Sequence, residues 1–219
     1  MENKSTENNI VKLAGVVTGT PSVTHEIEGE KFWEFLLDIK RLSGVNDTLP
    51  VTVPEKVLET SGIILSEGQC LCVEGELRSY NKLVGEKSKL IISTFAKELF
   101  ELTDEQLDDN FISLTGFICK PPVYRTTPFN REICDAILAV NRKNFKSDYL
   151  PLISWGRNAK YLENLPVGTK ICAEGRIQSR SYIKVVDGVS EERTAYEVSV
   201  QKLVNLDKLA KNELFVRAQ

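Results

Sequence analysis

The 219-residue chain has one histidine, five cysteines and no long apolar run. A membrane-spanning helix needs about 20 consecutive apolar residues, so none is expected here. The cysteine number is odd, and only Cys70 and Cys72 lie close together in the sequence. With His25 as the sole histidine, this spacing argues against a metal site. We therefore expect free, reduced thiols inside apolar strands, and neither a metal nor a cofactor.

Signals for secretion and for catalysis are also missing. The opening "MENKSTENN" lacks the apolar core of a secretory signal, which predicts a cytoplasmic protein. The chain has no Gly-rich phosphate loop, no zinc-protease motif and no nucleophile elbow. His25 lies in the acidic stretch "THEIEGE" and is typical of a solvated turn. Nothing in the residues favours an enzyme.

The charge of the chain is divided unevenly. Its net value is −3. Residues 1–105 carry 11 Lys and Arg against 18 Asp and Glu, a net charge of −7, whereas residues 106–219 carry 17 against 13, a net charge of +4. The halves therefore need not share a partner, and only the second suits a polyanion.

The chain repeats itself after about 101 residues. "NIVKLAGVV" (9–17) aligns with "NFISLTGFI" (110–118), and "CVEGELRSY" (72–80) closely resembles "CAEGRIQSRSY" (172–182). A period near 100 residues is typical of domain duplication rather than of a solenoid. The acidic joint "ELTDEQLDDN" predicts a boundary that separates an N-terminal domain, 1–105, from a C-terminal domain, 106–219.

Alternation of apolar and polar residues predicts five strands in the second copy, near 111–120, 132–142, 149–155, 169–182 and 194–205. A helical face over 157–165 separates the third strand from the fourth, and Asp187–Gly188 predicts a turn before the last. Gly75 and Gly175 interrupt the fourth strand of each copy and predict a bulge or bend. The order predicts an all-β chain of two tandem five-stranded OB-fold barrels, each with a short helix between strands 3 and 4.

The second copy adds aromatic and basic residues where an OB-fold binds its ligand. Tyr149 and Trp155 share one face of a strand, and Arg176, Arg180 and Tyr182 share another. Single-stranded nucleic acid needs this mixture, because bases stack on aromatic rings and phosphates follow cations. Any single aromatic residue could instead belong to the core. The first copy has Thr48, Pro54 and Lys82 in place of the three aromatic residues, which predicts that its binding face is degenerate.

Residues 110–206 resemble the bacterial single-stranded-DNA-binding protein family. The resemblance is carried by "NFISLTGFICKPPVYRTTP", "AILAVNR", "YLPLISWGRNAKYLENLPVGTKICAEGRIQSRSY" and "TAYEVSVQKLVNL". It implies base stacking on Phe145, Tyr149, Trp155 and Tyr182. The neighbouring cations predicted to contact nucleic acid are Arg125, Arg142, Lys143, Arg157, Arg176 and Arg180.

The resemblance also implies partners. We expect single-stranded DNA bound without sequence preference, in replication, recombination or repair, and a homodimer that presents four OB folds. Family members usually end in an acidic tip that recruits other enzymes, whereas this chain ends in "LVNLDKLAKNELFVRAQ". Because that tip is missing, we treat replication and recombination proteins as candidate partners. Two alternatives stay open: an OB-fold scaffold that docks proteins without strong DNA binding, and an RNA-binding protein.

Overall fold

The computed structural model describes residues 7–84, 87–103, 109–186 and 189–210. Their contacts form two compact units, which are treated separately below. One unit contains 11–111 and 177–197, and the other contains 112–176 and 198 onward together with the segment up to Ile10. The predicted boundary after residue 105 and the predicted turn at Asp187–Gly188 lie outside the described residues.

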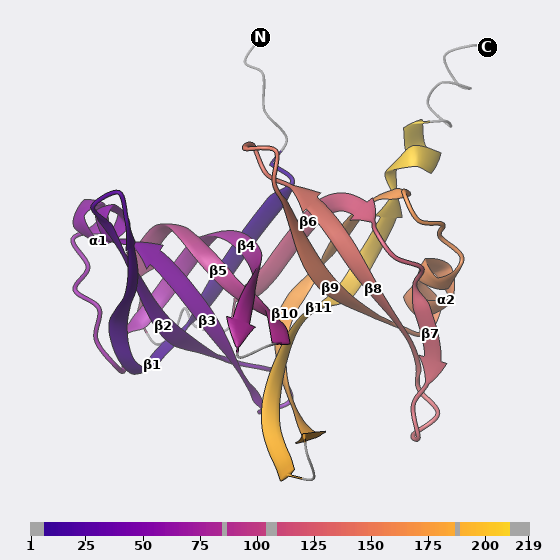
Figure 1. Cartoon of the computed structure of the whole chain (residues 1–219), viewed down its shortest axis with the longest axis horizontal. Coiled ribbons are helices and arrows are strands. Elements are labelled where there is room, and N and C mark those ends of the chain that lie inside the picture. Colours follow the sequence, from indigo (N-terminus) through magenta and orange to yellow (C-terminus); the bar gives the residue numbers. More distant parts are fainter. Residues whose placement is uncertain (1–6, 85–86, 104–108, 187–188, 211–219) are drawn as a thin grey trace. The chain divides into compact units, whose positions relative to one another are not determined.

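The first copy forms a closed barrel with one short helix. Its elements are β1 (Asn9–Ile27), β2 (Glu30–Lys40), β3 (Asn46–Pro54), α1 (Glu55–Ser61), β4 (Cys70–Val84) and β5 (Lys87–Glu101). β1 pairs with both β2 and β4, β2 pairs with β3, β3 runs parallel to β5, and β5 pairs with β4. Leu13, Leu37, Leu49 and Leu71 fill the interior, because alternate residues of each strand point inward. These strands are indigo to magenta in Figure 1.

The second copy repeats this order and adds one strand. Its elements are β6 (Asn110–Ile118), β7 (Val123–Thr126), β8 (Glu132–Asn141), β9 (Ser147–Trp155), α2 (Gly156–Glu163), β10 (Lys170–Val186) and β11 (Val189–Asn205). β6 pairs with β8 and β10, β8 with β9, and β9 runs parallel to β11, which neighbours β10. The all-β, OB-fold prediction is confirmed, with each helix between the third and fourth barrel strands. The short β7, which pairs with the outer side of β8, was not predicted.

Glycines at equivalent places let the strands approach closely. A Cβ atom at Gly15 would overlap the carbonyl oxygen of Asp38, and one at Gly116 would overlap that of Ala139. Gly75 faces β5 in the same way, and the pairing of β4 with β5 shifts register between Glu74 and Gly75. The bulge predicted at Gly75 is therefore confirmed. No side chain larger than hydrogen fits these contacts.

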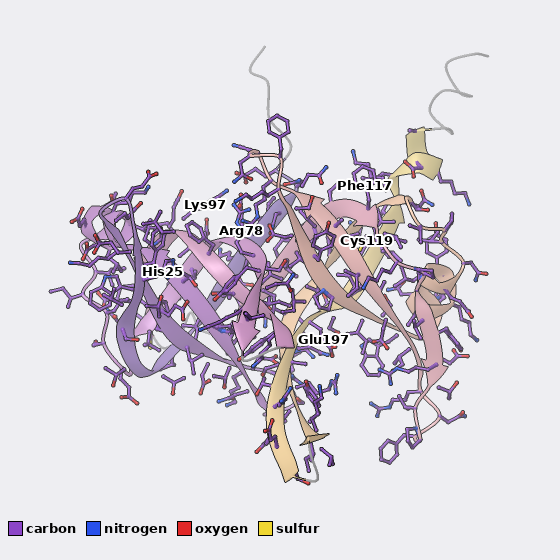
Figure 2. All side chains as sticks on the ribbon, viewed as in Figure 1. His25, Arg78, Lys97, Phe117, Cys119 and Glu197 are labelled. Atoms are coloured by element: carbon purple, nitrogen blue, oxygen red, sulfur yellow. The ribbon has the colours of Figure 1, made fainter. Side chains whose placement is uncertain are left out.

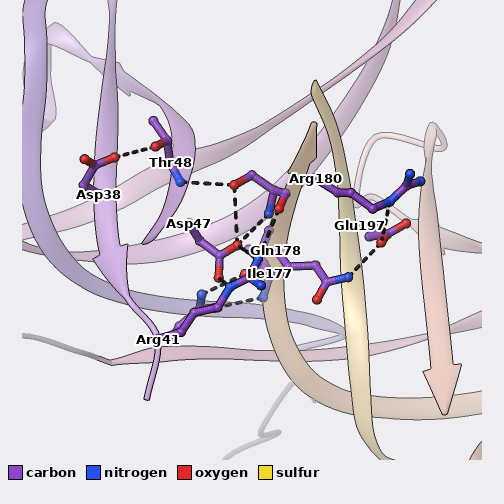
Figure 3. Close-up of polar contacts among 10 residues, drawn as sticks. Asp38, Arg41, Asp47, Thr48, Ile177, Gln178, Arg180 and Glu197 are labelled. Carbon is purple, nitrogen blue, oxygen red and sulfur yellow. Dashed lines mark hydrogen bonds and ion pairs between the residues drawn. The ribbon is translucent and has the colours of Figure 1, made fainter. Parts of the chain in front are cut away.

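The outer part of β10 and β11, residues 177–197, is called the arm here and groups with the first barrel. A polar latch holds it. The buried Asp47 Oδ1 accepts a hydrogen bond of 2.7 Å from the backbone N–H of Ser179, and Arg41 Nη2 donates one of 3.1 Å to the Ser179 carbonyl (Figure 3). The Thr48 backbone N–H donates to Ser179 Oγ at 3.2 Å. Because these groups satisfy one another, the arm has a fixed register on β3.

The cysteines are free thiols, as predicted. Cys72 and Cys134 are buried, and Cys70, Cys119 and Cys172 are partly exposed. Burial raises the pKa of Cys134 to about 11. Neither described helix has the length and apolar character to cross a membrane.

Candidate nucleic-acid interface

β9 presents two of the predicted aromatic residues on its outer side. Tyr149 is 50% exposed and Trp155 is 39% exposed, whereas Leu150, Leu152 and Ser154 between them are buried. The alternation of a strand produces this arrangement, since residues an even number apart share a face. Trp155 also precedes the first residue of α2, so the strand end and the helix start together fix its position.

Phe145 lies in the turn between β8 and β9 and is fully exposed. Its backbone φ is 61°, in the left-handed region that residues other than glycine rarely adopt. The equivalent residue of the first copy is Gly44, with a φ of 83°. A non-glycine residue in this conformation costs about 1–2 kcal/mol. The second copy therefore exposes an aromatic ring at a position whose backbone conformation favours glycine.

An ion pair fixes the base of the same turn. Arg142 Nε donates a 2.8 Å hydrogen bond to Asp148 Oδ2, and its Nη2 bonds the other carboxylate oxygen. The Asp148 side chain is fully buried, and the Arg142 backbone N–H donates to the Lys146 carbonyl at 2.7 Å. Arg41 and Asp47 form the same pair in the first copy, and the hydrogen bond to Asp47 raises the pKa of Arg41. Arg142 thus shapes the turn, and its predicted contact with phosphate stays a prediction.

The other predicted cations of this unit differ in their surroundings. Lys143 and Arg157 are exposed and form no ion pair within the described part of the chain. Arg125 is paired with Asp135 at 2.8 Å. Arg176 is half-buried. Tyr149 and Trp155 thus lie on β9 itself. Phe145 and Lys143 lie in the turn before β9, and Arg157 lies in α2 directly after it.

The last two predicted residues belong to the arm, hence to the unit of the first barrel. Tyr182 is 37% exposed, and the Arg180 guanidinium lies 5.7 Å from its ring centre. Arg180 also pairs with Glu197 at 3.6 Å, and Gln178 donates to the same carboxylate at 2.7 Å (Figure 3). Arg180 and Tyr182 form a cation–π pair, a surface on which a base can stack.

A polar cluster that the sequence analysis missed joins β7, β8 and α2. Lys160 Nζ lies 2.8 Å from Glu132 Oε1, and Tyr124 also hydrogen-bonds Glu132. The hydrogen bond from Lys160 lowers the pKa of Glu132, and the same bond raises the pKa of Lys160. These residues come from three elements, and only the fold brings them together.

Most cations of the described first barrel form ion pairs, whereas Lys40, Lys82 and Lys89 are exposed. Glu76 pairs with both Arg78 and Lys97, which Figure 2 labels. The cations of this barrel that form ion pairs are Lys12, Lys31, Arg41, Lys56, Arg78 and Lys97. At the positions of the second copy's aromatic residues it carries Thr48, Pro54 and Lys82. Among the described residues, no three His, Cys, Asp or Glu side chains are placed to hold a metal ion.

The strand order defines an OB-fold protein, and its second copy exposes aromatic rings and cations on β9 and the segments that flank it. Residues 109–206 match the family described as the Single-strand binding protein family. The second copy is therefore similar to this family over nearly its whole length.

Individual proteins are also similar to this chain. Two Staphylococcus aureus proteins, named Single-stranded DNA-binding protein 1 and Single-stranded DNA-binding protein 2, are 34% identical over 80 residues, which cover 33% of this chain and 48% of each relative. The chain therefore spans about half the length of these relatives. The crystal structure of wild-type single-stranded DNA binding protein from Thermus aquaticus is similar in fold, with a TM-score of 0.72 and 22% identity over 90% of this chain and 92% of that one. A deletion mutant of the same protein gives a TM-score of 0.73, with 22% identity over 90% of this chain and 93% of that one.

Proposed function

We propose that the protein binds single-stranded DNA without sequence preference and supports DNA replication, recombination or repair. The bases would stack on Phe145, Tyr149 and Trp155, and on Tyr182 of the arm. Stacking of this kind contributes about 1–3 kcal/mol per base and tolerates any sequence, since every base has a flat face. The Staphylococcus and Thermus relatives, whose names refer to single-stranded DNA, support the choice of ligand.

The observation that carries this proposal is Phe145, whose ring is fully exposed and whose backbone has a strained, left-handed conformation. A left-handed backbone at a non-glycine residue reduces stability, and the first copy avoids this cost with Gly44, although its turn exposes Leu42. Strain at such a residue is typical of functional positions. An exposed ring two positions before β9, which carries two more exposed rings, is most simply explained as a stacking platform.

Phosphates would follow the cations beside this platform. Lys143 and Arg157 are the leading candidates because both are exposed. Arg125, Arg142, Arg176 and Arg180 are further candidates, although acidic partners already neutralise three of them, namely Arg125, Arg142 and Arg180. If the cations act in this way, the logarithm of the association constant falls with the logarithm of salt concentration by about 0.7 per phosphate neutralised.

The double variant Tyr149→Ala/Trp155→Ala tests the proposal. Loss of two stacking partners should weaken binding of fluorescein-labelled oligo-dT by at least about 30-fold, measured by anisotropy at fixed salt. Phe100→Ala is the matched control, because it removes an exposed aromatic residue from β5 of the first barrel and should change affinity less than about twofold. Equal affinity of the double variant and the wild type would refute the site. A labelled oligo-U of equal length tests the RNA alternative.

We also propose the setting in which the protein works. It would act without catalysis, as a coat on DNA in the cytoplasm, associated with the nucleoid. A homodimer would present four OB folds, because each chain supplies two barrels. Replication or recombination proteins are candidate partners. Sedimentation equilibrium at several protein concentrations tests the dimer.

A further inference from the structure

The first barrel has a pocket of about 380 Å³ beside helix α1. Trp33 of β2, Leu58 of α1 and the loop residues Ile63, Ile64 and Leu65 give it an apolar lining. Glu55 and Glu59 of α1 add two carboxylates. All of these residues belong to one unit and are described, so the pocket is formed by the first barrel alone.

The second barrel packs its helix more tightly at the corresponding place. There α2 buries Ala159 and Leu162, and β8 contributes the buried Cys134. At the repeat spacing of 101, the counterparts of Leu162 and Cys134 are Ser61 and Trp33, and α1 buries no residue at all. The first copy has therefore kept the helix against the barrel, but its apolar residues Val57 and Leu58 are only half-buried. Apolar side chains next to α1 consequently remain open to a ligand.

The exposure of this loop is unusual. Ile64 is 87% exposed although it lies in a run of three large apolar residues, "IIL". Trp33 lines the pocket, and its buried indole N–H has no hydrogen-bond partner within the described residues. A buried donor without an acceptor costs free energy of about 1–3 kcal/mol. This N–H is out of reach of solvent, so the pocket offers a ligand the apolar surface of Trp33 rather than its donor.

The charge around the pocket selects the ligand. Glu59 is exposed and stands where the second copy has Lys160, so the sign of the helix surface is reversed. The barrel as a whole is acidic, with a net charge of −7 over residues 1–105. Phosphates are repelled by such a surface, whereas lysine and arginine side chains are attracted.

We propose that this pocket is a docking site for a peptide segment of a partner protein, in which one or two large apolar side chains are flanked by lysine or arginine. The apolar side chains would enter the space beside Leu58 and Ile64. A flanking cation would pair with Glu59. This proposal goes beyond DNA binding and does not depend on it.

The probe for this site is the labelled hexapeptide Gly-Lys-Leu-Leu-Arg-Gly, with Gly-Glu-Leu-Leu-Glu-Gly as its charge-reversed control. Anisotropy should show the basic peptide binding the full-length protein with a dissociation constant of about 10–100 µM, a strength ordinary for a short flexible peptide. The acidic peptide should bind at least about tenfold more weakly. Absence of binding at a protein concentration of about 1 mM would overturn the proposal.

Point variants distinguish binding in the pocket from nonspecific electrostatic attraction to the acidic barrel. Glu59→Lys should weaken the basic peptide about tenfold, and Ile64→Ser about fivefold, without loss of fold because Ile64 is exposed. Glu98→Lys on β5 makes the same charge change at an exposed site outside the pocket and should alter affinity less than about twofold. If Glu59→Lys and Glu98→Lys weaken binding equally, the pocket is not the site.

Tryptophan emission locates the peptide, because the chain has only two tryptophans. In Trp155→Phe the remaining Trp33 should change its emission when the basic peptide binds. Bound peptide with unchanged Trp33 emission would refute the location. Emission of Trp33 that varies with protein concentration alone would assign the pocket to a second copy of the chain, which would also overturn the proposal. Failure of oligo-dT binding in the same variant would leave the peptide result unaffected.

Discussion

Helix α2 packs Ala159 and Leu162 into the second barrel, whereas α1 at the same place in the first barrel buries nothing. The turn before β9 exposes Phe145, whereas the turn before β3 has Gly44. Against these differences, the close-approach glycines and the Arg–Asp turn pairs are the same in both copies. The two copies therefore share the glycines and turn ion pairs that close a barrel. They differ in the side chains that a barrel exposes to a ligand.

The largest expected difference concerns the two helices. Leu162→Ala removes a fully buried side chain from the second barrel and should lower its free energy of unfolding by about 3 kcal/mol. Leu58→Ala truncates a partly exposed side chain of α1, the counterpart of Ala159 in α2, and should cost less than about 1 kcal/mol. Urea unfolding measures the stability of each barrel through a single tryptophan. Trp155 emission in a Trp33→Phe background reports on the second barrel, and Trp33 emission in a Trp155→Phe background reports on the first. Equal losses would contradict the difference in packing.

An exchange at the turns should have a smaller effect. Phe145→Gly removes the strain of a side chain at positive φ and should stabilise the second barrel by about 1 kcal/mol. The same change should weaken oligo-dT binding about fivefold or more, because one stacking partner is lost. Gly44→Phe should destabilise the first barrel by a similar amount. Stabilisation together with unchanged DNA affinity would mean that Phe145 has no role in binding.

The smallest effect concerns the pH dependence of the second barrel. Burial raises the pKa of Cys134 from about 9 to about 11, so the unfolded chain loses this proton at lower pH than the folded one. Stability from this thiol is complete below pH 9 and declines as the pH rises toward 11. At pH 9.5 the loss should be less than about 1 kcal/mol. Cys134→Ala should flatten this decline in urea unfolding, and an unchanged slope would contradict the assignment.

The sequence predicted the fold because its strongest signals are local. Alternating apolar residues marked the strands, and the spacing of 101 residues revealed the duplication. The exposed face of Tyr149 and Trp155 followed from strand parity alone. Both helices were placed between the correct strands, because their periodicity differs from that of the strands.

What the sequence could not predict depends on contacts between distant residues. The sequence predicts that Arg142 contacts phosphate, but it does not show that Arg142 also pairs with the buried Asp148, because that pair forms only in the folded turn. The contact between Lys160 and Glu132 needs α2 to lie against β8. The pocket beside α1 arises from missing packing, which no local pattern records.

The latch between Asp47 and Ser179 has a consequence for the inheritance of the two copies. Cutting the gene at the repeat boundary would leave Asp47 buried with no backbone N–H from Ser179 to satisfy it, and would strip the arm of its seat on β3. The unit of the first barrel is therefore built from both repeats, since it contains a segment of β10 and β11.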